Sequence, residues 1–405
     1  MNHPIKMHAY SKIFLIFFQL GCISFGGPAA HLVFFHKTFV KELKWLDEHE
    51  YSQLLALAQI LPGPTSSQVG LAIGYVTRGY WGAICAWLGF TLPSAIVMTL
   101  VALLGIRLSP YLSSDFFHVI QLTVLAVVTW AFWQMLCSFC HQTWQYILMI
   151  GAASFIYFMQ TSFSQMLVIV LAAFVGILGA KYLKFETKKP PQKIYQGPVS
   201  KLNKHAYIWL VLFALPFVLF PLITNIYPSL LIKSFEDFYH TASLVFGGGH
   251  IVLPLLHQNF VETGLISNEN FDLGYAVAQL MPGPLFSFAS YLGTLLAITD
   301  SVIFNSAIAT LMIFMPSFFL IFGALPYWSW FIKQKKIYQA MAGINAAVVG
   351  ILLCLVVQMT QRYIIQWSDV LFLILVIALL RTKVPVWLTL IGTFGAYYSI
   401  LNLLV

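Results

Sequence analysis

A Pro-Gly-Pro sequence interrupts an apolar stretch at two places in this chain, and it limits what each stretch can become. The two copies are Ala58-Gln59-Ile60-Leu61-Pro62-Gly63-Pro64 and Ala278-Gln279-Leu280-Met281-Pro282-Gly283-Pro284, 220 residues apart (278 − 58). Proline removes a backbone donor and clashes with the preceding helical turn, and glycine frees the backbone between the two prolines. Inside a bilayer, freed backbone groups are costly unless protein or a water-filled cavity satisfies them. Each copy therefore predicts a helix break that lines a site.

The composition indicates that these breaks lie in a membrane protein. Hydrophobic residues make up 60% of the chain and charged residues 8%, whereas soluble domains have about 45–50% and about 25%. The mean hydropathy is +0.84. The net charge of +8 does not indicate nucleic acid as a partner, because the lysines and arginines lie in short loops, where membrane topology places them. We therefore predict an all-α, polytopic integral membrane protein with the lipid bilayer as its surroundings, and we expect no disulfide framework and no cleaved signal peptide.

Several apolar stretches are too short to cross a bilayer, which takes about 20 residues. The first, Ser11–Ser24, stops at Phe25-Gly26-Gly27-Pro28, and the Pro-Gly-Pro break separates Tyr51–Leu61 from Thr65–Val76. Re-entrant hairpins and broken spanning helices both account for such short arms, and we favour hairpins because they keep the neighbouring basic residues on one side. Longer runs suited to spanning are Tyr80–Ile106, Val119–Phe139, Gln145–Met159, Phe163–Ala180 and Ile208–Ile226.

The second half of the chain repeats the first. Four landmarks recur in the same order: the Phe-Gly-Gly breaks (246 − 25 = 221), the Pro-Gly-Pro breaks (282 − 62 = 220), two Pro-Ser pairs (316 − 93 = 223) and two Ala-Val-Val runs (347 − 126 = 221). We therefore predict an N-terminal repeat over residues 11–180, a basic linker over 181–207, a linking transmembrane helix over 208–226 and a C-terminal repeat over 233–404.

The charged loops indicate that the two repeats have opposite orientations. The segment His36–Glu50 carries three lysines, whereas its counterpart Asn259–Asp272 carries three acidic residues and no lysine or arginine. Basic loops stay on the cytoplasmic side, so this alternation predicts inverted-topology repeats. Each repeat would contain discontinuous, re-entrant helices plus about four spanning helices.

Helix ends determine which ligand such breaks suit. The amide groups of the helix that follows a break point into the gap with the positive end of the helix dipole, which favours an anion. Thr65, Ser66, Ser67 and Gln68 add neutral donors, and none of the four breaks contains an acidic residue. An oxyanion site is therefore favoured over a cation site, and we expect no metal and no cofactor.

Three basic residues near the breaks each have two interpretations. His31 and His250 are either ligand or proton-coupling groups, or histidines that pack between helices and bind a carbonyl. Arg78 either neutralises a dianion from the cytoplasmic side or lies at the membrane interface as a positive-inside residue.

At these motifs the chain resembles the chromate transporter family, in its long form with two repeats. The matching residues are Phe25-Gly26-Gly27-Pro28 with His31, Gln59 to Pro64 with Gln68, Phe246-Gly247-Gly248-Gly249 with Pro254, and Pro282-Gly283-Pro284 with Gly293. The resemblance covers nearly the whole chain and implies a multi-pass protein of the bacterial inner membrane that exports chromate, an analogue of sulfate. His250 stands where the family pattern leads us to expect an aromatic or apolar residue.

The breaks and the resemblance together predict the residues that contact the oxyanion. These are Gly26, Gly27, His31, Gln59, Pro62, Gly63, Pro64, Ser67, Gln68, Arg78, Gly247, Gly248, Gly249, His250, Gln279, Pro282, Gly283 and Pro284.

Other functions find less support in the sequence. An enzyme would need a catalytic set, and the chain has no HExxH, no GxSxG and no Walker motif, which also excludes coupling to ATP within this chain. The sequence Cys137-Ser138-Phe139-Cys140-His141 matches a haem attachment pattern by chance, because the charge pattern places it inside the cell. The open alternative is a transporter of sulfate or another tetrahedral oxyanion with chromate as an incidental substrate. A homodimer is a candidate assembly.

Overall fold

The computed structural model describes residues 9–108, 111–159, 164–182, 205–246, 249–331, 334–382 and 384–404. These residues form helices joined by short turns, and no β-strand occurs among them, so the predicted all-α class is confirmed. Most of the predicted basic linker, together with Gly247 and Gly248, lies outside the described residues.

The chain divides into two compact units, and each unit takes segments from both halves of the sequence. The first unit consists of Met1–Thr99, Thr187–Gly249 and Pro282–Tyr338, and the second of Leu100–Glu186, His250–Met281 and Gln339–Val405. The compact units therefore do not coincide with the sequence repeats.

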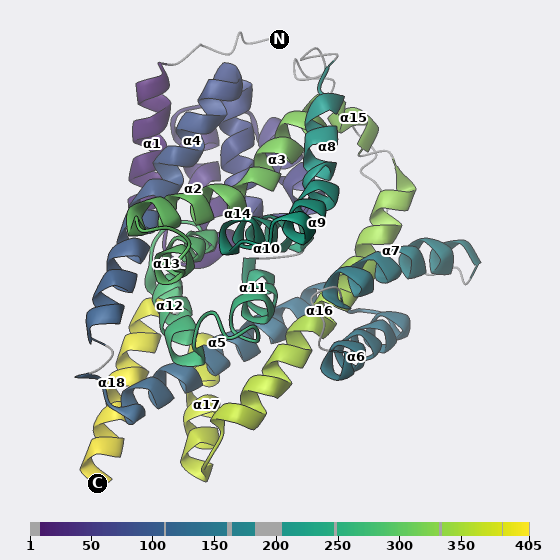
Figure 1. Cartoon of the computed structure of the whole chain (residues 1–405). Coiled ribbons are helices and arrows are strands. Elements are labelled where there is room, and N and C mark those ends of the chain that lie inside the picture. The colour runs from purple at the N-terminus through teal and green to yellow at the C-terminus, as the bar shows by residue number, and fades with distance from the viewer. Residues whose placement is uncertain are drawn as a thin grey trace. The chain divides into compact units, whose positions relative to one another are not determined.

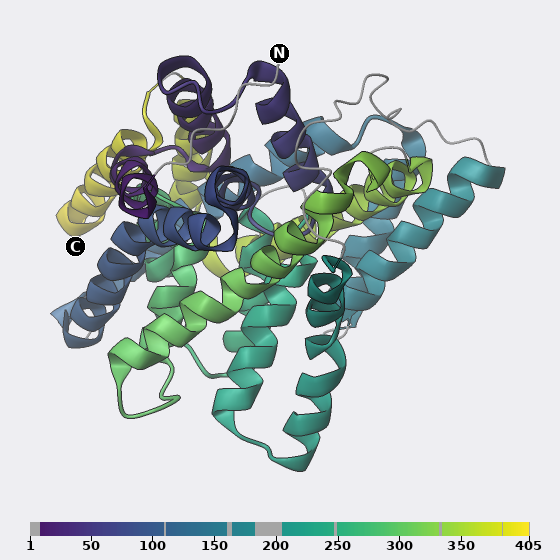
Figure 2. The same ribbon diagram turned by 90° about the horizontal axis from the view of Figure 1, so that it is seen from above.

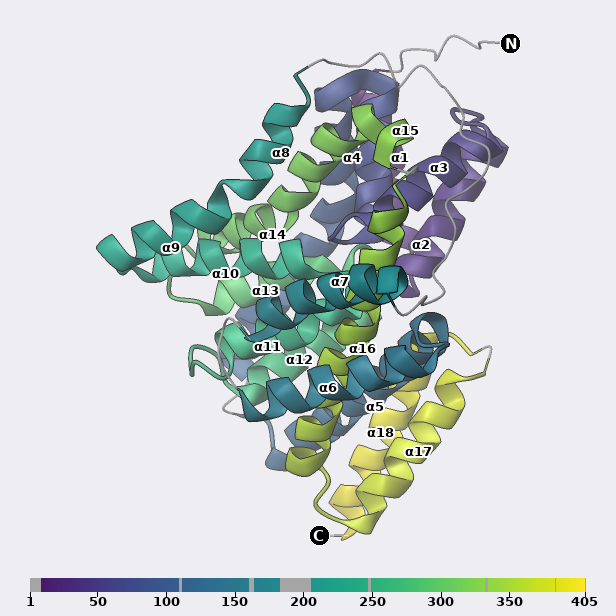
Figure 3. The ribbon, with the colours of Figure 1, turned by 90° about the vertical axis from the view of Figure 1, so that its right-hand side faces the viewer.

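The first unit contains the short helices on both sides of the two breaks of the first repeat. Its central helix α14 (Val302–Ala324) packs against α8 (Tyr207–Ala214), α10 (Leu230–Leu244) and α13 (Phe288–Leu295) (Figures 1 and 3). Helices α9 and α10 form the hairpin seen in Figure 2. The remaining helices of the unit are α1 (Tyr10–Ile23), α2 (Gly27–Phe35), a π-helix (His36–Glu42), α3 (Glu48–Ile60), α9 (Pro216–Ile226), α15 (Trp328–Phe331), and the 3-10 helices Leu285–Ser287 and Leu325–Tyr327.

Helix α4 (Thr65–Leu108) contains a sharp reversal and then runs on into the second unit. Its backbone leaves helical geometry at Arg78 and Gly79, where Gly79 has a φ of +65°. The helix therefore consists of a short arm from Thr65 to Thr77 and a long arm from Tyr80. These are the boundaries that the predicted arm Thr65–Val76 and the predicted run Tyr80–Ile106 anticipated.

The second unit is built around α5 (Ser114–Phe139). Helix α5 packs against α12 (Asn268–Leu280), α17 (Trp367–Leu380) and α18 (Val386–Leu404) (Figure 1). The other helices of this unit are α6 (Thr143–Phe158), α7 (Ser164–Tyr182), α11 (Val252–Phe260) and most of α16 (Lys335–Tyr363); the 3-10 helix Gly249–Ile251 begins at the last residue of the first unit.

Six helical stretches in the described part are long and apolar enough to cross a membrane. They are Thr65–Leu108, Ser114–Phe139, Ser164–Lys181, Tyr207–Ile226, Val302–Tyr327 and Lys335–Tyr363. The predicted span Gln145–Met159 corresponds to α6, which has 16 residues and belongs to the shorter apolar helices. The chain is thus a multi-pass membrane protein that also contains short apolar helices.

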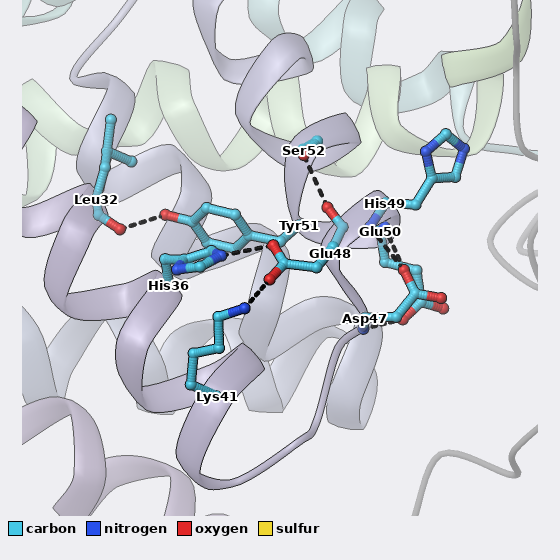
Figure 4. A network of polar contacts seen from close by, with 9 residues as sticks. All are labelled: Leu32, His36, Lys41, Asp47, Glu48, His49, Glu50, Tyr51 and Ser52. Carbon is cyan, nitrogen blue, oxygen red and sulfur yellow. Dashed lines mark hydrogen bonds and ion pairs between the residues drawn. The ribbon is translucent and has the colours of Figure 1, made fainter.

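The charged segment His36–Glu50 is divided between two helices. A π-helix ends at Glu42, and α3 then starts at Glu48 behind the Asp47 cap, whose side chain accepts hydrogen bonds from the amides of His49 and Glu50 (Figure 4). The Glu48 carboxylate binds His36 at 2.6 Å and also Lys41 (Figure 4). These contacts fix the start of α3, the helix that ends at the first Pro-Gly-Pro break.

Candidate functional site

The two Pro-Gly-Pro breaks lie in the first unit, and each is bonded to the glycine break of the other repeat. The amide of Gly63 donates to the carbonyl of Val245 at 2.7 Å, and the amide of Gly283 donates to the carbonyl of Ser24 at 3.1 Å. Val245 and Ser24 are equivalent residues of the two repeats (245 − 24 = 221), each directly before a Phe-Gly-Gly break. The repeats therefore exchange a matching pair of backbone hydrogen bonds.

The Pro-Ser pair of each long helix lies close to the Pro-Gly-Pro break of the other repeat. A Cβ atom built on Gly63 would lie 2.8 Å from Ser317 Oγ, and one built on Gly283 would lie 2.9 Å from Ser94 Oγ. Both glycines also have a positive φ, +122° and +97°, that side-chain-bearing residues rarely adopt. Glycine is therefore required at the centre of each Pro-Gly-Pro, both for its backbone angle and for the approach of the opposite helix.

Gly249, at the second glycine break, lies near both the first glycine break and the second Pro-Gly-Pro. A Cβ built on Gly249 would lie 3.5 Å from Pro28 Cγ and 3.6 Å from Leu285 Cδ2. Together with the two amide bonds, this proximity places all four predicted breaks in one region of the first unit. The sequence predicted the breaks one by one, and the structure places them side by side.

His31 links two of these breaks. Its Nε2 lies 3.1 Å from the carbonyl of Ser24, and its Nδ1 lies 3.2 Å from Ser66 Oγ. Because a carbonyl only accepts, Nε2 carries the proton, and in the neutral ring Nδ1 then accepts from the hydroxyl of Ser66. The ring is 1% exposed, and both of its nitrogens have protein partners. This geometry is the one expected of a packing histidine.

The N-terminus of α4 holds donors that lack acceptors. The amides of Thr65, Ser66 and Ser67 have no hydrogen-bond acceptor among the residues that the structure describes, since the first bond of the helix runs from Gln68 N to Pro64 O. The hydroxyls of Ser67 and Ser24, which are 3% and 0% exposed, also lack a partner in the described part of the chain. A buried polar group without a partner costs about 1–3 kcal/mol. A bound anion would satisfy these donors, and the helix dipole would favour its charge.

The central glycines of the breaks and the first turn of α4 differ in whether their donors are free. The glycine amides of Gly63 and Gly283 were expected to face the oxyanion, but both are engaged by carbonyls. The free donors come instead from the first turn of α4 and from serine hydroxyls. Gln68 is fully buried and turns its amide nitrogen to the Pro62 carbonyl at 2.6 Å, so its oxygen, rather than a donor, is left over.

Two predicted site residues belong to the second unit. His250 Nδ1 lies 3.1 Å from the hydroxyl of Tyr275 and 3.4 Å from Gln279 Nε2. An amide nitrogen only donates, so Nδ1 is the acceptor and Nε2 carries the proton of the neutral ring. His250 and Gln279 therefore form a pair of their own, apart from the set of breaks in the first unit.

The other predicted residues vary in their surroundings. Pro64, Pro284 and Gly249 are buried at the breaks, Pro62, Pro282 and Gly27 are partly buried, and Gly26 and Gln59 are exposed. The guanidinium of Arg78 lies 4.5 Å from the ring centre of Tyr10, at the start of α1. This cation–π contact holds Arg78 at the reversal of α4. Pro28 is the second residue of α2, whereas Pro64 precedes α4 by one residue.

Sequence reasoning did not select Ser24, Ser94 and Ser317, and it named Ser66 only as a neutral donor. Ser94 and Ser317 were noted only as landmarks of the repeat, although a serine after a helix proline in both halves was a usable signal. Ser24 gave no such signal, because its counterpart is Val245 and the shared group is a backbone carbonyl.

Comparison with known proteins gives matches along most of the chain. A sequence profile described as chromate transporter matches residues 11–177 and again residues 232–398. An uncharacterized transporter of Methanocaldococcus jannaschii is 28% identical over 94% of this chain and 90% of its own length. A probable chromate transport protein of Synechococcus elongatus is 27% identical over 86% of this chain and 84% of its own.

A further relative carries a related name, and structural comparison adds nothing to it. A chromate transport protein of Cupriavidus metallidurans is 25% identical over 93% of this chain and 89% of its own. No solved structure matches the fold.

Proposed function

Because the chain belongs to the chromate transporter family, we propose that it exports chromate across the bacterial inner membrane as a secondary transporter. The family accounts for an oxyanion substrate and a membrane setting. Export is the direction that the resemblance of its motifs implies. A secondary mechanism fits a chain without a Walker motif.

The observation that carries the proposal is the set of buried donors without acceptors at the start of α4. Three consecutive amides, at Thr65, Ser66 and Ser67, and the Ser67 hydroxyl have no acceptor among the described residues. Chromate is a tetrahedral dianion whose oxygens accept hydrogen bonds from several directions. Neutral donors at a helix N-terminus bind such a group without burying a second charge.

Sulfate remains the alternative substrate, because it shares the shape and charge of chromate. A site made of backbone amides and hydroxyls recognises tetrahedral oxygens and contains no group that tells sulphur from chromium. We therefore expect the two anions to compete for one site, with chromate carried in cells that encounter it.

Ser67→Ala tests the site directly. Loss of a hydrogen bond to a charged group costs about 1.5–3 kcal/mol, so the KM for chromate should rise about 10- to 150-fold. Transport is measured as chromate uptake into inverted vesicles, with sulfate as competitor and with membrane abundance checked. Ser52→Ala is the matched control, because that hydroxyl is exposed on α3 and binds the Glu48 carbonyl at 2.7 Å.

The two variants separate the outcomes. An unchanged KM in Ser67→Ala would remove the start of α4 from the pathway. Absence of both chromate and sulfate uptake by the wild-type protein in either vesicle orientation would overturn the proposed function itself.

A further inference from the structure

Asp272 is a buried carboxylate that the oxyanion site does not use. It lies in the second turn of α12, 1% exposed, and its Oδ2 accepts a hydrogen bond from the hydroxyl of Tyr363 at 2.6 Å. The sequence had grouped it with the acidic loop residues Glu262 and Glu269, both of which are exposed. Among the described residues, no lysine, arginine or histidine forms an ion pair with it.

The charged groups around Asp272 form hydrogen bonds with other residues. Arg362, next to Tyr363 on α16, donates to Asn268 at the start of α12, and His257 also binds Asn268, at 3.2 Å. Burial raises the pKa of Asp272, through-space electrostatics from Glu269 raises it further, and that from Arg362 lowers it. On α5, α17 and α18, three titratable side chains form a group of their own, in which Asp369 binds His118 at 3.0 Å and Tyr397 at 2.8 Å.

A carboxyl in this position has two low-energy forms. As a neutral acid it needs no counter-charge, and as an anion it has one hydroxyl donor and no paired cation. Ionisable residues buried in membrane proteins are costly and mark proton relays and ion pathways. A side chain that neutralises by binding a proton when buried, and ionises when exposed to water, can couple a proton to a conformational cycle.

Asp272 has no titratable counterpart in the first repeat. Its counterpart in the first repeat is Ser52 (272 − 220 = 52), which is exposed and cannot carry a proton at neutral pH. The helix face that starts at Asp272 continues with Tyr275 and Gln279, three and seven residues on, and both contact His250. Three residues after Gln279 the chain enters the break Pro282-Gly283-Pro284. At the position of Asp272, one repeat thus carries a carboxyl group that the other lacks.

We propose that Asp272, with Tyr363 as its hydrogen-bond donor, is the proton-binding site that couples oxyanion transport to a pH gradient. The inference rests on the proposed transport function. On loading, an O–H bond forms at the Asp272 carboxyl with a proton from water, and on release that bond breaks and the proton returns to water on the other side. No other bond changes. The acidic segment 259–272 is on the outer side in the topology predicted from charge, so loading occurs from outside.

The test uses purified full-length protein in liposomes and two assays of the same preparation. The first is exchange of labelled chromate or sulfate without a pH gradient, and the second is net uptake driven by an imposed pH gradient. In Asp272→Asn, which keeps the shape and an acceptor for Tyr363, exchange should persist and the stimulation by the gradient should fall to about onefold. Asp300→Asn, the same change at an exposed aspartate that does not act on Asp272, is the control and should behave as the wild type.

Tyr363→Phe supplies an independent readout. The Tyr363 hydroxyl stabilises the ionised carboxylate, so its loss should move the midpoint of the pH dependence of net uptake upward by about 1 pH unit. A purely structural role of Asp272 would leave that midpoint in place.

The outcomes are distinguishable from failure of the proposed function. Full gradient stimulation in Asp272→Asn, or an unshifted midpoint in Tyr363→Phe, would overturn the proton site while exchange still showed a transporter. If Asp272→Asn lost exchange as well, the midpoint in Tyr363→Phe would decide. Absence of exchange in the wild-type protein would instead refute the transport function on which the inference rests.

Discussion

The convergence of the breaks can be tested by adding one methyl group to Gly283. Gly283 has a φ of +97°, and the left-handed backbone costs a residue with a Cβ about 1–2 kcal/mol. The new Cβ would also lie 2.9 Å from Ser94 Oγ and 3.1 Å from Ser94 Cβ, and overpacking of this kind costs about 1–3 kcal/mol. Gly283→Ala should therefore destabilise the protein by about 2–5 kcal/mol.

Gly264 separates the two contributions. It has a φ of +76° and no atom within 4 Å of its Cβ position, so Gly264→Ala should cost only the backbone share, about 1–2 kcal/mol. Ser94→Gly removes the obstructing side chain, and in that background Gly283→Ala should cost about as much as Gly264→Ala.

The assay is unfolding of the purified protein in mixed micelles, followed by tryptophan fluorescence, for the single and double variants. A cost of Gly283→Ala no greater than that of Gly264→Ala would show that the second Pro-Gly-Pro does not approach the Pro93-Ser94 segment of α4. The picture of two repeats that exchange contacts at their breaks would then be wrong.

Three further predictions follow from the same structure. His250→Ala should reduce transport at unchanged membrane abundance. Recovery of transport in His250→Gln would assign His250 a hydrogen-bonding role, and loss of transport in both variants would assign it a proton-carrying role. Wild-type transport in both variants would leave only a packing role. The hydrogen bond from His36, and after it one from Lys41, lowers the pKa of Glu48. The contribution of Glu48 to the free energy of unfolding should therefore be full above the pKa of an unfolded glutamate, about 4.3, and vanish as the pH falls through the lower folded pKa. The free energies of unfolding of the wild type and Glu48→Gln, measured against pH, check this, and a difference between them that persists in acid would contradict it. Under the inverted-repeat model, a membrane-impermeant thiol reagent applied outside should label Thr263→Cys but not Lys193→Cys, and labelling of both from one side would refute the inversion.

Much of the architecture was accessible from the sequence because its causes are local. Adjacent prolines and glycines end helices at the four breaks, so α1 stops at Ile23 and α3 at Ile60, within a residue of the predicted arms. The repeat was visible because the same breaks recur at a nearly constant spacing. The family profile also matches twice, over 11–177 and 232–398.

The contacts at the site were not accessible because their partners are far apart in the chain. Nothing local in Gly63 indicates that its amide binds the carbonyl of Val245, since both groups are common to every residue type. Asp272 was misjudged for a related reason: acidic neighbours made it resemble a loop residue, whereas α12 starts four residues earlier and buries it. The compact units likewise cut across the repeats, which a one-dimensional pattern does not reveal.

The hydrogen bonds exchanged between the repeats set an order in which the protein is completed during its synthesis. The amide of Gly63 is made in the first half of the chain, but the carbonyl of Val245 that accepts its hydrogen bond follows 182 residues later (245 − 63). Until the ribosome has passed that point, the first Pro-Gly-Pro break holds a backbone donor that lipid cannot satisfy. A nascent or truncated N-terminal half therefore presents an unfinished membrane segment to insertion factors and to quality-control proteases. The second half thus supplies the hydrogen-bond partner that completes the first half.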